Sequence, residues 1–204
     1  CAIVYNRCFP GVINHFINYD GIGEFVSELF YSLPLDTSIM MSDLSIKTDE
    51  LAEMLNRRGK FEIIDHHPTA TWLAAKYPWA LVDTTMSATW LMYEVMKTQF
   101  NIEDMLPFVT AVNNYDTWGG GPGPNEQSLS LNRLLNVLGT ARFFDRFLSN
   151  PSLKFDESEK LLLELRDEEI NKFLKQVSES ATVSVDASGN KYAMVAIDRY
   201  ISEA

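Results

Sequence analysis

The chain contains 204 residues, 46% of them hydrophobic and 22% charged, which is the composition of a folded domain and not of a disordered or collagen-like chain. It has no run of roughly 18 or more apolar residues, so we expect no membrane-spanning segment. With 28 acidic and 17 basic side chains its net charge is -11, which argues against a protein that grips long duplex DNA by its phosphates. An acidic chain can still bind phosphate groups where metal ions, or local arginines and lysines, carry the positive charge.

The two cysteines predict a reducing environment. If Cys1 and Cys8 lie on one helix, about 10 Å separates them along its axis, which exceeds the span of a disulfide. No signal peptide is visible, so we expect a cytoplasmic protein with free thiols. Because the chain lacks an initiator methionine, we also expect it to begin partway into a longer polypeptide.

The first half of the chain alternates predicted helices and predicted strands. In chain order we expect a helix over 1–8, a strand over 12–19, a helix over 23–32, a strand over 38–42, a helix capped by Thr48 and stopped by Gly59, strands over 61–64 and 80–82, and a helix opening at Ser87. This order predicts an α/β fold with a mostly parallel sheet flanked by helices.

An aspartate follows each of the four predicted strands, at Asp20, Asp43, Asp65 and Asp83. In a parallel sheet these positions share one edge, which is where open α/β sheets bind ligands. Four carboxylates there would repel one another unless a cation lay among them. An aspartate can also begin a turn or cap the next helix, and for Asp20 and Asp83 this simpler interpretation is favoured.

The second half of the chain is predicted to be helical and to end in a hairpin. We expect a helix over 102–114, a loop over 119–125 without phosphate-loop spacing, two helices through Phe147, a break over 150–152, a long helix over 157–180, and hairpin strands over 182–185 and 192–197. A lone hairpin is marginally stable, so it should belong to a second domain or be completed by another chain. The predicted division is a first domain over 1–150, a linker helix over 151–181 and the start of a second domain over 182–204.

The strongest chemical signal is the tripeptide Asp65-His66-His67 directly after an apolar strand, in a chain with only three histidines. A neighbouring aspartate can fix the tautomer of an imidazole, and imidazole with carboxylate suits Mn²⁺, Zn²⁺ or iron. The alternative is a histidine pair in a surface turn. The third histidine, His15, lies inside a predicted strand and is interpreted as structural.

This tripeptide resembles a motif of the DHH phosphoesterase family. Three further segments resemble motifs of that family in the same order: Met40-Met41-Ser42-Asp43 at a strand end, Ser87-Ala88-Thr89 at a helix start and Tyr115-Asp116-Thr117-Trp118 at a helix end. The resemblance covers roughly residues 1 to 150 and implies a Rossmann-like domain. The family includes RecJ-type exonucleases, oligoribonucleases, cyclic-dinucleotide phosphodiesterases, exopolyphosphatases and family II pyrophosphatases.

The resemblance implies a site for two metal ions, usually Mn²⁺, with Mg²⁺ or Co²⁺ as alternatives. Asp43 would bridge the ions, while His66 and Asp116 would complete the ligands of one of them. Asp65 would support these ligands without touching the metal, and His67 would lie beside the phosphate to stabilise charge or help the leaving group. Two such cations can bind a bridging hydroxide and clamp the phosphoryl oxygens.

The aromatic residues beside this aspartate allow two interpretations. Tyr115 and Trp118 could stack a nucleic-acid base, but packing against the sheet is the favoured interpretation.

The sequence departs from the family at both ends. A first motif of the type His-x-Asp-x-Asp-Gly is absent, and we expect it immediately before Cys1 in the natural polypeptide. The glycine-rich, histidine-containing motif of the family's C-terminal substrate-binding domain is also absent. We therefore expect these 204 residues to hold part of the site and to be weakly metal-binding or inactive when isolated.

The function expected from these features is metal-dependent hydrolysis of phosphodiester bonds in short or single-stranded nucleic acid. The alternatives are a pyrophosphate or polyphosphate hydrolase and a degenerate family member that acts as a non-catalytic scaffold. A Rossmann-like binding domain with coincidental motifs is a further alternative, but no Gly-x-Gly-x-x-Gly follows a strand. The sequence leaves the oligomeric state open.

Overall fold

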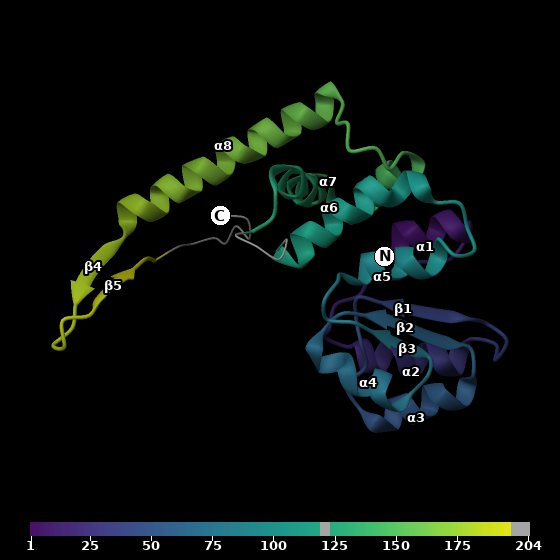
Figure 1. Cartoon of the computed structure of the whole chain (residues 1–204). Coiled ribbons are helices and arrows are strands. Elements are labelled where there is room, and N and C mark those ends of the chain that lie inside the picture. The colour runs from purple at the N-terminus through teal and green to yellow at the C-terminus, as the bar shows by residue number, and fades with distance from the viewer. Residues whose placement is uncertain (119–122, 197–204) are drawn as a thin grey trace.

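The computed structural model describes residues 1–118 and 123–196 and has an α/β fold. A small parallel sheet of three strands, in the order β1-β2-β3, is flanked by helices (Figure 1). The strands are β1 (Ile39–Ser42), β2 (Phe61–Asp65) and β3 (Ala80–Val82). The helices are α1 (Ala2–Cys8), α2 (Ile22–Ser32), α3 (Asp49–Arg58), η1 (Pro68–Ala70), α4 (Thr71–Lys76), α5 (Ala88–Met96), η2 (Glu103–Met105), α6 (Leu106–Asp116), α7 (Glu126–Ser149) and α8 (Glu157–Ser180).

Consecutive residues of the central strand β2 are buried in two different cores. Ile63 packs with residues of α2, α3 and α4, whereas Ile64 packs with residues of α1, α5, α6 and α7. Side chains alternate between the two faces of a strand, so a strand with helices on both faces is apolar at successive positions. This double burial holds the carboxyl end of β2, and the polar residues that follow it, in a fixed place.

Local sequence signals locate the ends of several helices as expected. The Thr48 side chain accepts a hydrogen bond from the Leu51 backbone N–H at the start of α3, and Gly59 ends this helix at φ 75°. Ser87 caps α5 by accepting from the Trp90 backbone N–H. Gly139, at φ 72°, interrupts α7, which corresponds to the two helices expected there.

The predicted strand over 12–19 is wrong. The segment forms no strand in the described structure, and the exposed fraction of Ile13 reaches 81%. Its alternating apolar residues satisfy the local pattern of a strand, but a strand also needs a backbone ladder, and β1 pairs only with β2 among the described residues. Asp20 consequently ends a loop and does not lie at the sheet edge.

The C-terminal part of the described chain is an extended arm. Asp156 and Glu159 form a reciprocal cap at the start of α8, and Arg146 of α7 contacts Glu159 at 2.6 Å. At the far end of α8, β4 (Thr182–Val185) and β5 (Lys191–Met194) form the expected antiparallel hairpin (Figure 1). Residue 197, the last position of the second predicted strand, lies outside the described residues.

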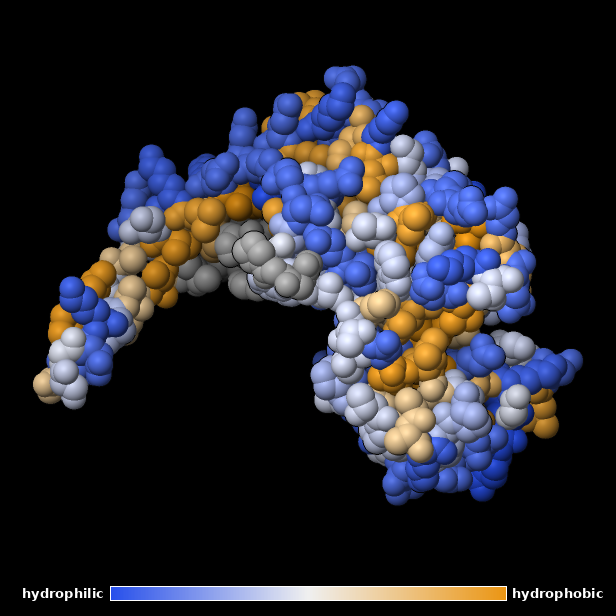
Figure 2. Space-filling model, viewed as in Figure 1, coloured by the Kyte–Doolittle hydropathy of each residue, from blue (hydrophilic) through white to orange (hydrophobic). Residues whose placement is uncertain are grey.

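The arm exposes apolar side chains. Figure 2 shows apolar surface along the concave side of α8 and on the hairpin. Among the described residues of the arm, Leu161, Leu165, Val183 and Met194 are exposed. The assignment of the hairpin to a second domain, and the division of the chain at residues 150 and 181, stay predictions. None of the described helices combines the length and the apolar character needed to cross a membrane.

Candidate metal centre

Two neighbouring strands bring the principal polar residues of the predicted site together. In the parallel register Ser42 of β1 lies opposite Ile64 of β2, and the Asp43 backbone N–H donates to the Ile64 carbonyl at 3.0 Å. Asp43 therefore follows one strand directly beside the point where the other ends in Asp65. The open edge formed by these strand ends is where α/β sheets place ligands.

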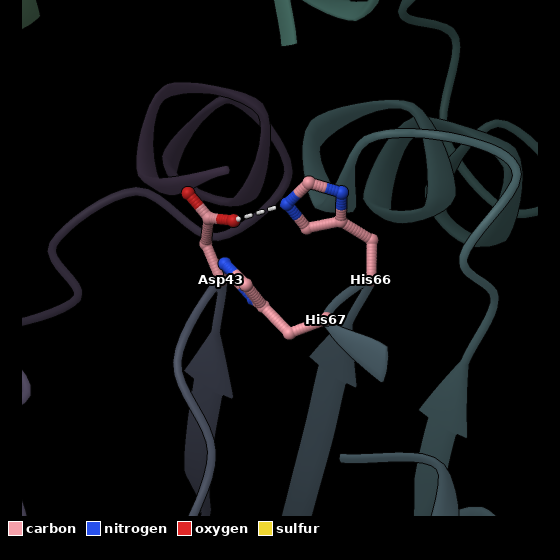
Figure 3. A group of neighbouring side chains, drawn as sticks. All are labelled: Asp43, His66 and His67. Atoms are coloured by element: carbon pink, nitrogen blue, oxygen red, sulfur yellow. Dashed lines mark ion pairs between the residues drawn. The ribbon is translucent and has the colours of Figure 1, made fainter. Parts of the chain in front are cut away.

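Asp43 has an unusual backbone conformation that directs its carboxylate. Its φ of 61° lies in the left-handed region, which aspartate and asparagine tolerate better than most residues. Figure 3 shows its carboxylate directed at the His66 ring, and Asp43 Oδ1 lies 3.2 Å from His66 Nε2. Such conformations persist where the surroundings hold them and cluster at functional sites.

Asp116 reaches the same histidine from a distant part of the chain. It is the last residue of α6, and its Oδ2 atom lies 3.4 Å from His66 Nε2. Helix α6 is anchored through buried Phe108 and Val109, and its Asn113 side chain accepts from the Ser87 backbone N–H at the start of α5. The His66 imidazole is therefore within reach of two carboxylates, from β1 and α6.

The Asp65 carboxylate contacts both histidines. Its side chain is fully buried, and its Oδ1 atom accepts from the His66 backbone N–H at 2.8 Å and contacts His67 Nδ1 at 2.7 Å. Its Oδ2 atom has no partner among the described residues. A carboxylate at Nδ1 favours the tautomer that carries the proton there, so Nε2 of His67 keeps its lone pair.

The donor atoms of this site match the requirements of a metal ion. Ligand atoms of Asp43, His66 and His67 all lie within 4.8 Å of one another, and the three side chains converge in Figure 3. A carboxylate with imidazoles is a donor set that suits Mn²⁺ and related divalent ions. The structure thus brings together all five predicted site residues, and the group of possible ligand atoms includes His67 as well as the predicted ligand His66.

The charges at the site also favour a cation. Burial raises the pKa of the Asp43 carboxyl above its ordinary value, and the nearby Asp116 carboxylate raises it further. Both effects disfavour the ionised form of Asp43 when no positive charge is present. A divalent ion between these carboxylates would remove the repulsion and restore the ionised form.

The remaining two strand-end aspartates stay outside the site. Asp83 accepts hydrogen bonds from the backbone N–H and hydroxyl of Thr85, and these bonds lower the pKa of its carboxyl. Asp83 thus initiates a turn, which is the interpretation favoured from the sequence. Asp20 is exposed at a loop end, and His15 is exposed beside the Phe25 ring.

The aromatic residues near Asp116 differ from the expectation of core packing. Trp118 is 69% exposed and has a left-handed backbone conformation, at φ 56°, just after the end of α6. Tyr115 is half-buried, and its hydroxyl accepts a hydrogen bond from Asn132 of α7. The core-packing expectation is therefore wrong for Trp118.

Sequence reasoning overlooked Tyr19. Its ring contacts the His67 ring edge-on with centroids 5.7 Å apart, and its buried hydroxyl has no partner among the described residues. Burial raises the pKa of the Tyr19 hydroxyl, with further contributions from Asp65 and Asp43. The predicted strand over 12–19 obscured this residue, and no local pattern signalled its position.

The start of α1 also lies beside the site. The Cys1 amino group donates to Thr89 Oγ1 at 2.9 Å. Cys1 lines the same pocket as Asp43.

Comparisons with known proteins show phosphodiesterases among the similar chains. No family model matches the chain. It is 27% identical over 200 residues to the oligoribonuclease NrnB of Bacillus subtilis, covering 86% of this chain and 49% of that protein. It is 25% identical over 139 residues to a 3′,5′-cyclic-nucleotide phosphodiesterase of Helicobacter pylori, covering 58% of this chain and 40% of that protein. The chain thus spans about half the length of the first of these curated relatives and less of the second.

A solved structure shares the fold. The crystal structure of an uncharacterized protein from Helicobacter pylori G27 superposes with a TM-score of 0.52 at 15% identity, covering 92% of this chain and 69% of that one. At this identity the likeness concerns the fold alone. The two curated relatives, at low identity, support a DHH-type phosphoesterase family for the chain.

Proposed function

We propose that the chain is the catalytic part of a metal-dependent phosphodiesterase that hydrolyses short or single-stranded nucleic acid. The observation that carries this proposal is the convergence of Asp43, His66, His67 and Asp116 at the carboxyl edge of the parallel sheet. The similarity to an oligoribonuclease and to a cyclic-nucleotide phosphodiesterase supports phosphodiesters as the substrate class.

The residues present fit a divalent metal ion. Asp43, His66 and Asp116 would hold it, and Mn²⁺ suits their mixture of carboxylate and imidazole, with Mg²⁺ or Co²⁺ as alternatives. When bound, such ions supply Lewis acidity that neutralises phosphoryl charge and makes water a stronger nucleophile. The metal also explains how a chain of net charge -11 would attract a polyanion.

Asp65 and His67 have different roles in the proposed reaction. Asp65 holds the proton on Nδ1 of His67 and fixes the orientation of the ring, so Asp65 is a positioning residue. His67 faces the space beside Asp43 and His66. Its imidazolium form, with a proton on Nε2 as well as on Nδ1, would stabilise the phosphoryl charge or donate the Nε2 proton to the departing oxygen. Because phosphoryl transfer depends mostly on positioning and charge stabilisation, this rigid arrangement suits the reaction.

The proposal is tested with the full-length gene product and a short 5′-phosphorylated oligonucleotide in the presence of Mn²⁺. We expect release of mononucleotides, identified by mass spectrometry, and loss of the release on chelation. A protein that binds metal yet releases nothing would contradict the nucleic-acid substrate and direct attention to pyrophosphate or polyphosphate. A protein that binds no metal would instead favour a non-catalytic scaffold.

Replacing Asp65 by asparagine should lower kcat about 10- to 100-fold, the usual effect of removing a partner that orients a metal-site histidine. Asparagine keeps an acceptor for the His66 backbone N–H but removes the charge that holds the proton on His67 Nδ1. The matched control is Asp186→Asn in the turn between β4 and β5, where the carboxylate accepts hydrogen bonds from the Ser188 and Asn190 backbone N–H groups. Equal kcat values for the two variants would show that Asp65 does not position the histidines.

A further inference from the structure

A pocket opens directly beside the candidate metal centre. Its volume is about 570 Å³, within the range of small-molecule sites, and it shares His66 and Asp116 with the centre. The rest of its wall comes from the turn after β3, the first turn of α5 and the C-terminal half of α6. The residues of this wall that carry the argument are Thr84, Thr85, Trp90, Thr110, Asn113 and Asn114.

The chemistry of this wall favours an uncharged polar ligand. Apart from the two residues shared with the metal centre, its polar groups are hydroxyls and carboxamides, and no lysine or arginine is among the described residues that line it. A second phosphate placed here would face the Asp116 carboxylate without a cationic side chain beside it. Hydroxyls and carboxamides instead match the hydroxyls of ribose and the polar edge of a base.

Two carboxamides of the wall are held in fixed orientations. Asn113 Oδ1 accepts from the Ser87 backbone N–H, and Asn114 Oδ1 accepts from the Asn125 backbone N–H, both at 2.8 Å. The bonded oxygen fixes the orientation of each carboxamide. Neither Nδ2 group has a hydrogen-bond partner in the described part of the chain, so each can donate to a ligand. Donors that are already oriented lose little conformational entropy when a ligand binds.

One side of the pocket is aromatic. Trp90, in the first turn of α5, is half-buried and is among the residues that line the pocket. An aromatic wall next to polar donors is a common combination in sites for single-stranded nucleic acid, because every base has an apolar face.

We propose that this pocket binds the nucleoside, ribose and base, that is attached to one oxygen of the scissile phosphate. This inference rests on the proposed phosphodiesterase function and specifies what lies next to the reacting group. A nucleoside in the pocket places its phosphate at His66 and Asp116, which belong to both the pocket and the metal centre. The pocket thereby selects nucleotide diesters over inorganic phosphoanhydrides.

The test compares two phosphodiester substrates in the full-length gene product with Mn²⁺: the dinucleotide UpU and methyl p-nitrophenyl phosphate, which has no nucleoside. Thr110→Trp fills the pocket from an exposed position of α6. We expect it to lower the ratio of kcat/KM for UpU to that for the simple diester at least tenfold. Asn114→Asp, which keeps the acceptor for Asn125 and removes the donor, should lower the same ratio.

The matched control is Thr98→Trp. Thr98 lies in the turn after α5 and is also exposed, and its hydroxyl also donates to a nearby backbone carbonyl, but it does not line the pocket. This variant should keep the ratio of the unsubstituted protein. The melting temperature of each variant shows whether it is folded. The ratio of the two kcat/KM values does not depend on the fraction of active protein, because both substrates are measured with the same sample.

The outcomes separate this inference from the proposed function. If the unsubstituted protein cleaves UpU and neither Thr110→Trp nor Asn114→Asp changes the ratio, the pocket assignment is overturned while the phosphodiesterase stands. If the unsubstituted protein cleaves pyrophosphate but neither diester, the proposed function fails and the pocket assignment fails with it.

Discussion

Replacement of Asp43 by asparagine is expected to lower hydrolysis by the full-length gene product more than about 100-fold without unfolding it. The substitution removes the charge that lies 3.2 Å from His66 Nε2 and that would bind the metal. Asparagine has nearly the same shape and tolerates the φ of 61° that this position requires. The measurements are kcat, bound metal by mass spectrometry and melting temperature.

The matched control is Asp20→Asn. Asp20 is an aspartate that the sequence also placed after a strand, but the structure puts it at an exposed loop end. We expect this variant to keep its activity and its metal content. If Asp43→Asn is as active as Asp20→Asn, the metal does not bind at the end of β1.

Replacement of His67 by alanine is expected to lower kcat about 10²- to 10⁴-fold, the range for loss of a general acid or base. Its metal content should fall much less than its activity, because Asp43, His66 and Asp116 remain. His15→Ala is the matched control, since His15 is an exposed histidine whose ring contacts the Phe25 ring and which lies outside the candidate metal centre. Parallel loss of metal and activity in His67→Ala would make His67 a ligand instead.

The surroundings of His67 are compatible with two roles, as a metal ligand and as a group that transfers a proton. Its Nδ1 atom is held by the buried Asp65 carboxylate, and its ring is also packed against Tyr19. A ring held in this way suits either metal binding or proton transfer through its other nitrogen. Metal content and kcat measured together on one variant separate the two roles, which neither measurement achieves alone.

Much of the local structure could be predicted from short stretches of sequence. The helix from Thr48 to Gly59 has a capping side chain at one end and a glycine at the other, and both act within one turn. The strand that ends at Asp65 is a short apolar run, and the histidines follow it along the chain. The long helix over 157–180 has its own capping residues and matches its predicted bounds.

Other predictions failed because they concerned contacts between distant segments. The alternating residues over 12–19 satisfy the local preference for a strand, but pairing depends on a free neighbouring strand. Trp118 was expected in the core, but it is exposed in a left-handed conformation just after α6. Tyr19 was overlooked because its position against His67 follows from the path of a loop.

The sequence by itself determined the α/β class and the main helices, and it singled out the residues proposed for the site, because capping, periodicity and motif order act over short stretches of chain. Only the tertiary structure decided that Asp116 meets Asp43 at His66, that Asp20 and Asp83 stay outside the site, and that a pocket whose described lining contains no lysine or arginine adjoins it. These features depend on the packing of helices and strands that are far apart in sequence. The free energy of packing comes from contacts between segments that are distant in sequence, so the pattern of one short segment cannot predict it.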